Sequence, residues 1–197
     1  MKENDFPGTF IVIEGADGAG TTTQSERLAE EIGAELTFEP TDMSIGRKVD
    51  EMISSNDNSP ETVALGFAAD RMVHLEERVI PWLEEGKTVI SDRYAHSSLV
   101  YQPIMGADRG WVEELNKEAL KPDLTVILDI SAEVGMSRVE ERGHDGNIFE
   151  EMSFQQKVVK RYRELKDREN VAVVDAAGSK DEVFRSVKTA VEDKLDF

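Results

Sequence analysis

The stretch FIVIEGADGAGTTTQ, residues 10–24, most constrains what this chain can fold into. An unbroken apolar run leads directly into Gly15, Gly18 and Gly20, and a segment with helical spacing follows. Glycines let the backbone turn sharply, so that successive N–H groups can point to the same side. The stretch therefore predicts a strand, a tight loop and a helix that begins around Thr22.

Short apolar, β-branched runs recur along the chain at residues 35–39, 88–91, 124–130 and 171–175. Runs of this kind are typical of strands that are buried on both faces of a parallel sheet. Segments with helical spacing lie between them, including 61–86, with a possible kink at Pro81, and 150–169. The alternation predicts an α/β fold, in which a central parallel five-stranded sheet has helices on both faces, and a single domain over 1–197.

The composition narrows the classes of function. The chain has 41 Asp and Glu against 23 Lys and Arg, a net charge of −18 that would repel nucleic acid. It has no cysteine for a disulfide or a thiolate metal site, and no apolar run long enough to span a membrane. We expect no nucleic-acid partner, no membrane partner and a cytoplasmic location. The spread of the acids also suggests adaptation to high salt, where ions screen self-repulsion.

The glycine-rich stretch predicts phosphate binding, because its N–H groups and the helix N-terminus favour an anion. It matches the pattern G-x-x-x-x-G-K-[ST] except that Thr21 stands where the lysine belongs. The next residue, Thr22, can hold Mg²⁺ through its hydroxyl. The alternative is a glycine-rich turn without a ligand. Loss of one donor to transition-state charge costs about 10²- to 10³-fold in rate, so another cation is needed if catalysis survives.

Three other marks have a functional and a structural interpretation. Asp92 and Arg93 follow an apolar run and could bind Mg²⁺ and phosphate, or form a plain ion pair. Phe67 and Arg71 share a helix face and could bind a base and its phosphate, or be a core ring and a surface arginine. The segment at about 138–150 could be a mobile lid that carries cations, or a solvated helix end.

In their order along the chain, these marks resemble the thymidylate kinase family. The resemblance runs from Phe10 to about Val174 through FIVIEGADGAG, FEP, FAADR, DRYAHSSLVYQ, PDLTVILDI and FEEMSFQQKVVKRY, and the pair FAADR and DRYAHSSLVYQ is its most specific part. It implies a P-loop kinase fold, transfer of the γ-phosphate of ATP to dTMP with Mg²⁺ as cofactor, and a homodimer.

The resemblance also implies roles for individual residues. It places the ATP phosphates on Gly15, Ala16, Asp17, Gly18, Ala19, Gly20, Thr21, Thr22 and Thr23. It places dTMP on Glu39, Phe67, Arg71, Arg93, Ser98, Tyr101 and Gln102, with the Phe67 ring on thymine and Tyr101 under the deoxyribose. The implied metal ligands are Thr22 and Asp92. The implied catalytic residues are Asp17, Asp92, Arg93, Arg138 and Arg142.

The sequence departs from this family at Thr21, where the family has lysine, and at Asn147 and Ile148, where the family often has Asp-Arg. Arg138 or Arg142 could compensate for the missing charge. Two alternatives to a dTMP kinase follow. One is a catalytically weak homologue that binds nucleotide as a sensor or partner protein. The other is a kinase for another deoxynucleoside monophosphate, such as dUMP.

Overall fold

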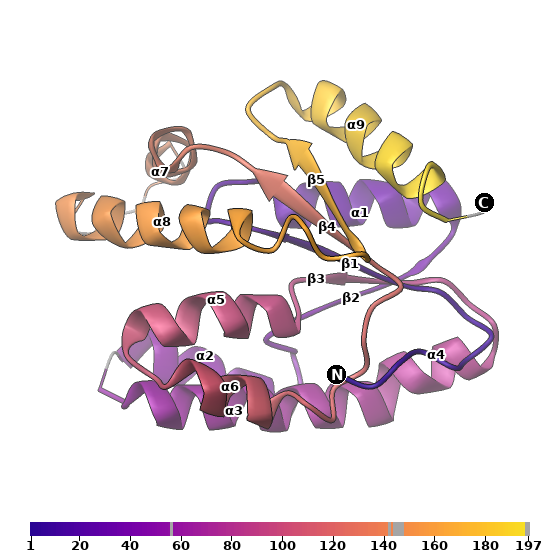
Figure 1. Ribbon diagram of the computed structural model, residues 1–197, viewed down its shortest axis with the longest axis horizontal. Helices are drawn as coiled ribbons and strands as arrows, with labels where there is room; N and C mark the ends of the chain where they lie inside the picture. The colour runs from indigo at the N-terminus through magenta and orange to yellow at the C-terminus, as the bar shows by residue number, and fades with distance from the viewer. Residues whose placement is uncertain (56, 142, 144–147, 196–197) are drawn as a thin grey trace.

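The computed structural model describes residues 1–55, 57–141, 143 and 148–195, with side chains in the last range from residue 151 onward. In this part of the chain, five parallel strands form one sheet in the order β2-β3-β1-β4-β5 (Figure 1). They are β1 (Phe10–Gly15), β2 (Glu35–Phe38), β3 (Val89–Asp92), β4 (Leu124–Asp129) and β5 (Val171–Asp175). The predicted α/β fold and its five-stranded parallel sheet are confirmed.

Helices cover both faces of the sheet (Figure 1). On one face lie α1 (Thr21–Ile32) and α9 (Lys180–Glu192), which pack against each other. On the other lie α2 (Ser44–Ser55), α3 (Pro60–His74), η1 (Leu75–Val79), α4 (Ile80–Glu84), α5 (Ala95–Met105), α6 (Arg109–Leu115) and α8 (Ile148–Arg163). The short helix α7 (Ala132–Glu140) packs on α8 and on the glycine-rich loop.

The central strand β1 explains why its sequence is an unbroken apolar run. Ile11 and Ile13 pack into the core beneath α1 and α9, whereas Phe10 and Val12 pack against η1 and α4 on the opposite face. All six residues of β1 are buried. A fully buried side chain of this size contributes roughly 1.5–3 kcal/mol, so the strand is anchored firmly on both faces. The glycine-rich loop follows the carboxyl end of β1, at the edge of the sheet where all five parallel strands end.

The long helix expected over 61–86 is divided into α3, η1 and α4. Ser59 caps α3 by accepting a hydrogen bond from the N–H of Thr62, and Pro60 takes the first helical position. The π-helical turn η1 lies immediately before Pro81, which cannot donate a backbone hydrogen bond. The helix is thus widened just before Pro81, and the kink expected there stays a prediction.

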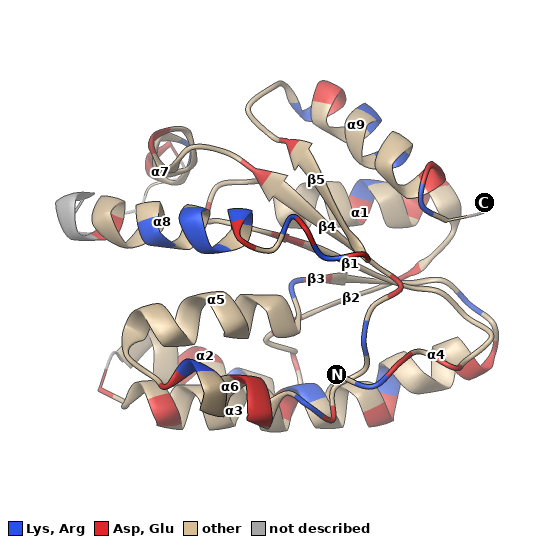
Figure 2. Ribbon diagram, in the orientation of Figure 1, with Lys and Arg blue, Asp and Glu red and all other residues tan. Residues whose placement is uncertain are grey.

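The helix expected over 150–169 begins and ends earlier, at Ile148 and Arg163. Val158 and Tyr162 of its apolar stripe are buried against the sheet, and Leu165 is buried in the turn that follows. Acidic side chains lie on several helices, whereas α8 carries a group of basic ones (Figure 2). No helix among the described residues is long and apolar enough to cross a membrane.

Candidate active site

The glycine-rich loop joins β1 to α1 at the carboxyl edge of the sheet. Gly18 and Gly20 have φ values of 79° and 95°, in the left-handed region that disfavours a side chain. A Cβ atom on Gly18 would lie 2.1 Å from the carbonyl oxygen of Gly135 in α7. No side chain caps α1, since Gly20 occupies the cap position. The free N–H groups of the first turn are therefore available to an anion.

A cavity of about 690 Å³ lies over this loop. Its walls include Asp17, Gly18, Gly20, Thr21, Thr22, Thr23, Met136 and Phe154. Thr21 is buried and supplies no charge. Among the described residues that line the cavity, Arg93 is the only lysine or arginine. The loop can thus accommodate an anion, with positive potential from backbone N–H groups and, in the described part of the chain, from the guanidinium of Arg93.

Thr22, which lines the cavity, contacts Asp92 at the end of β3. The hydroxyl of Thr22 donates to Oδ2 of Asp92 over 2.5 Å. The other oxygen of Asp92, Oδ1, is buried and has no hydrogen-bond partner in the described part of the chain. Mg²⁺ prefers one or two such oxygen ligands and completes its shell with water and substrate phosphates. The residues fit Mg²⁺, although no group of three or more acidic, histidine or cysteine residues forms a cage among those described.

Arg93 lies between the glycine-rich loop, which we call the phosphate loop from here on, and a second cavity. Its backbone has φ of 65°, an uncommon value for a residue with a side chain, and its N–H donates to the carbonyl of Ile13 over 2.9 Å. The guanidinium donates to the carbonyl of Gly15 over 3.1 Å and to Oδ1 of Asp17 over 2.9 Å. It also lies 5.5 Å from the ring centre of Tyr101. These contacts fix the charge at the junction of the two cavities.

The second cavity, of about 260 Å³, is less polar. Phe67, Arg71, Ser98, Tyr101 and Gln102 line it, together with Glu39, Pro40 and Met105. Phe67 and Arg71 therefore line the same cavity from α3, in agreement with the shared helix face that their spacing predicts. The side-chain oxygen Oε1 of Gln102 is buried without a partner among the described residues, which marks it as a group that a ligand can satisfy.

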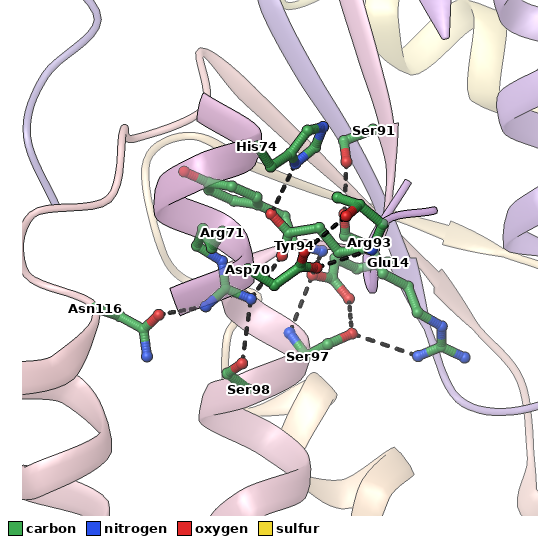
Figure 3. A network of polar contacts seen from close by, with 12 residues as sticks. Glu14, Asp70, Arg71, His74, Ser91, Arg93, Tyr94, Ser97, Ser98 and Asn116 are labelled. Carbon is green, nitrogen blue, oxygen red and sulfur yellow. Dashed lines mark hydrogen bonds and ion pairs between the residues drawn. The ribbon is translucent and has the colours of Figure 1, made fainter. Parts of the chain in front are cut away.

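The guanidinium of Arg71 is held in a buried network (Figure 3). It donates to Oε2 of Glu39 over 2.7 Å and to Oγ of Ser98 over 3.2 Å. It also donates to Oδ1 of Asn116, and its carbon lies 5.1 Å from the ring centre of Tyr94. The simple alternative of a surface arginine is excluded for Arg71, whose residue exposure is 1%.

Sequence reasoning missed the residues that support this network. His74 contacts Oε1 of Glu39 through Nδ1, over 3.0 Å, and Oγ1 of Thr37 through Nε2, over 2.6 Å. Asn116 follows α6 and reaches Arg71 from 45 positions away in the sequence. Neither residue belongs to a motif, so only the packing of α3 against β2 and α6 reveals them.

Glu14 is another missed residue, and it joins β1 to α5 (Figure 3). Its Oε1 accepts from the N–H groups of Tyr94 and Ser97, and its Oε2 accepts from the hydroxyls of Ser97 and Tyr162. Burial raises the pKa of Glu14, while these donors and Arg93 oppose the shift. A signal did exist in the sequence, because Glu14 is a charged residue inside an otherwise apolar strand.

The predicted lid is described only in part. Arg138 lies in α7, and its guanidinium donates to the carbonyls of Ala176, Ala177 and Gly178 over 2.9, 3.1 and 3.2 Å, with a longer contact of 3.4 Å to Gly18. It therefore ties α7 to the β5–α9 connection. Arg142 and Asn147 lie outside the described residues, as does the side chain of Ile148. The guanidinium of Arg138 is therefore held by backbone carbonyl oxygens of the β5–α9 connection. This placement favours a structural role for Arg138 over that of a mobile cation.

Comparison with known proteins agrees with this geometry. A family model described as thymidylate kinase matches residues 13–187. A probable thymidylate kinase of Methanococcus maripaludis is 38% identical, over 94% of this chain and 96% of its own. Probable thymidylate kinases of Pyrococcus abyssi and Methanococcus vannielii are 38% and 42% identical, over 95% and 79% of this chain and 98% and 77% of their own. The chain belongs to the thymidylate kinase family.

Proposed function

We propose that this chain transfers the γ-phosphoryl group of ATP to dTMP, giving ADP and dTDP, with Mg²⁺ as cofactor. Thymidylate kinase activity and the use of ATP accord with the family. The observation that carries the assignment of residues is that the phosphate-loop cavity and the less polar cavity share Asp17 and Arg93. Phosphoryl transfer needs donor and acceptor phosphates to meet around positive charge, and this junction provides that arrangement.

On the donor side, residues 15–23 bind the phosphates of ATP through their N–H groups and the N-terminus of α1. A smaller cavity of about 210 Å³ shares Gly18, Gly20 and Thr23 with the loop and is walled by Arg138 and Gly178. We assign the adenine ring to this space, where the guanidinium of Arg138 is held by carbonyl oxygens and offers a flat face for stacking.

On the acceptor side, the ring of Phe67 stacks on thymine, and Ser98 and Gln102 hydrogen-bond its edge. Tyr101 lies under the deoxyribose. Arg71 and Arg93 bind the phosphate of dTMP. The position of Glu39, which pairs with the guanidinium of Arg71, orients that guanidinium for the acceptor. The buried Nε of Arg71 has no partner among the described residues, which supports a further acceptor at this site.

Thr22 and Asp92 would hold Mg²⁺, directly or through water. When bound, Mg²⁺ neutralises phosphate charge. Arg93 supplies a fixed guanidinium for the charge that develops between donor and acceptor, and Tyr101 and Asp17 keep it in place. Burial raises the pKa of the Tyr101 phenol, which therefore stays protonated and donates to Asp17. The chain then acts as one kinase domain, with transfer that requires no covalent intermediate.

The test is ADP formation from ATP and Mg²⁺ with dTMP, dUMP, dCMP and dGMP offered in turn. We expect dTMP to be the preferred acceptor and turnover to stop when a chelator removes Mg²⁺. Nucleotide binding without turnover on any acceptor would instead support the weak binding homologue that Thr21 suggests. Preference for dUMP would support the other alternative.

The resemblance also leads us to propose a homodimer in the cytoplasm. Leu65 in α3 is apolar and 51% exposed, and α3 packs beside α2. Burial of this side chain against a second copy would remove apolar surface from water. Analytical ultracentrifugation of the wild type and of Leu65→Glu tests the dimer. A monomeric wild type would contradict it.

A further inference from the structure

Helix α8 contacts the phosphate loop through the side chain of Gln155. This residue is 5% exposed, and its amide faces Asp17, which lies 138 positions earlier in the sequence. Its Oε1 accepts from the backbone N–H of Asp17 over 3.4 Å, and its Nε2 donates to Oδ2 of the same residue. One planar amide therefore contacts both the backbone and the carboxylate of Asp17.

The carboxylate of Asp17 is divided between two sets of partners. Oδ2 faces Gln155, whereas Oδ1 accepts from Arg93 over 2.9 Å and from the phenol of Tyr101 over 3.1 Å. Rotation of this carboxylate would therefore shift the guanidinium of Arg93. Gln155 is the contact that opposes the rotation from the side of α8.

The two-point contact makes a strict chemical demand. Asp17 presents an N–H donor and a carboxylate acceptor, so its partner needs an acceptor and a donor side by side. A glutamine amide offers both, and so does a protonated carboxylic acid. A leucine offers neither, and a carboxylate offers no donor and adds repulsion against Asp17.

We propose that Gln155 is a positioning residue for phosphoryl transfer, which holds the carboxylate of Asp17 and thereby the guanidinium of Arg93 in the phosphate-loop cavity. The inference rests on the proposed function. It matters more in this chain than in a loop with lysine, because Thr21 brings no charge and Arg93 is the only lysine or arginine lining that cavity among the described residues. Displacement of about 1 Å at such a site can reduce the rate about 10²-fold.

The decisive variants are Gln155→Leu and Gln155→Glu, measured as kcat and KM across pH. Gln156 supplies matched controls, because it is adjacent on α8 but exposed, and its Nε2 donates to Oε1 of Glu133 over 3.4 Å, away from Asp17. We expect both Gln155 variants to lose about tenfold or more in kcat at about pH 8, with KM changed less than about twofold. Gln156→Leu and Gln156→Glu should match the wild type.

The pH profile separates positioning from packing. In Gln155→Glu the introduced carboxyl lies against Asp17, and like charge raises its pKa. As the pH falls towards about 5.5, the protonated acid regains both contacts, so kcat relative to the wild type should recover severalfold. Gln155→Leu should show no such recovery. Parallel profiles for the two variants, or unchanged kcat in both, would overturn the proposal.

A second measurement does not depend on turnover. Gln155 accepts the backbone N–H of Asp17, so the amide of Asp17 should exchange its hydrogen with solvent faster in Gln155→Leu than in Gln156→Leu. Equal exchange rates would overturn the proposal even if the enzyme were inactive. Failure of the wild type to turn over dTMP counts against the proposed function instead, so the two failures are distinguishable.

Discussion

The two cavities that share Arg93 differ in the groups that supply their charge. The phosphate-loop cavity relies on backbone N–H groups, a helix N-terminus and one guanidinium, and it is the larger and more polar of the two. The acceptor cavity relies on buried side chains, with Arg71, Glu39 and Asn116 joined in one network. A site built from backbone N–H groups can keep its shape when a side chain is replaced. A site built from paired buried charges cannot, because replacement of one member leaves its partner buried without a counter-charge.

The first prediction concerns Arg93, which lines both cavities together with Asp17. Arg93→Ala should lower kcat by about 10³-fold or more, because it removes a guanidinium aimed at the transferring phosphoryl group. Arg93→Lys should recover only part of the loss, since an ammonium cannot reproduce the contacts to Gly15 and Asp17 together. Steady-state kinetics with both substrates varied checks this. A loss below about tenfold would show that another cation serves the site.

The second prediction addresses the acceptor network. Arg71→Met leaves the carboxylate of Glu39 buried without its guanidinium and should reduce the free energy of unfolding by about 3–5 kcal/mol. The double variant Arg71→Met with Glu39→Gln should recover much of this stability, but not the affinity for dTMP. Urea denaturation and the KM for dTMP separate the two effects. If the single and double variants are equally unstable, the network does not act as a unit.

The third prediction tests the phosphate loop. Thr21→Lys places an ammonium in the position that the Walker pattern reserves for it and should raise kcat, by up to about 10²-fold. The effect on the KM for dTMP should be small, because Thr21 does not line the acceptor cavity. Unchanged or lower kcat would mean that the loop of this chain already has its full positive charge from other groups.

The fourth prediction concerns α5, the helix that carries Ser98, Tyr101 and Gln102 into the acceptor cavity. His96 lies in this helix, and burial lowers its pKa to about 3. The unfolded chain takes up a proton near pH 6.5, whereas the folded chain does not, so stability should be fully present above about 6.5 and fall as the pH drops towards 3. Between about pH 7.5 and 5 the loss should be about 2 kcal/mol.

His96→Leu should flatten this pH dependence. The free energy of unfolding from urea titrations at several pH values provides the measurement. Glu14 works in the opposite direction, because burial raises its pKa and its contribution declines as the pH rises through the raised value. Glu14→Gln is therefore a useful companion variant. If the slope of stability against pH is the same in the wild type and in His96→Leu, the histidine is not held neutral.

The smallest effect should come from Arg138→Ala. Its guanidinium braces the β5–α9 connection and lies at the wall of the cavity that we assign to adenine. We expect the KM for ATP to rise severalfold, with kcat and the KM for dTMP little changed, as for uniform binding. A large fall in kcat with unchanged KM would instead return Arg138 to the catalytic role that the family resemblance implies.

Some of these regions could be predicted from the sequence better than others. The strands were predictable because each is buried on both faces, and such burial requires an unbroken apolar run. The phosphate loop was predictable because its conformation requires glycine at particular positions. Glu14, His74, Asn116 and Gln155 were not identified, because their partners in the site are distant in the sequence. Their positions depend on how helices pack, which no local pattern specifies. Glu14 did leave a signal, as a charged residue in an otherwise apolar strand.

Arg138 shows a related limit. Its spacing placed it correctly near a helix end, but the direction of its side chain depends on the β5–α9 connection, almost 40 positions later. A sequence pattern gives the helix face, and the partner on that face comes from the fold. Arg93, by contrast, was named as a phosphate ligand from the sequence, and the structure places it in the lining of both cavities.

The most direct test of the account is ADP formation by the wild type and by Arg93→Ala with ATP, Mg²⁺ and each of dTMP, dUMP, dCMP and dGMP. We predict that the wild type prefers dTMP and that Arg93→Ala still binds ATP but loses turnover by about 10³-fold. Turnover that survives in Arg93→Ala, or a wild type that binds nucleotide and transfers no phosphoryl group, would contradict the claim that Arg93 at the junction of the two cavities makes this chain a working dTMP kinase.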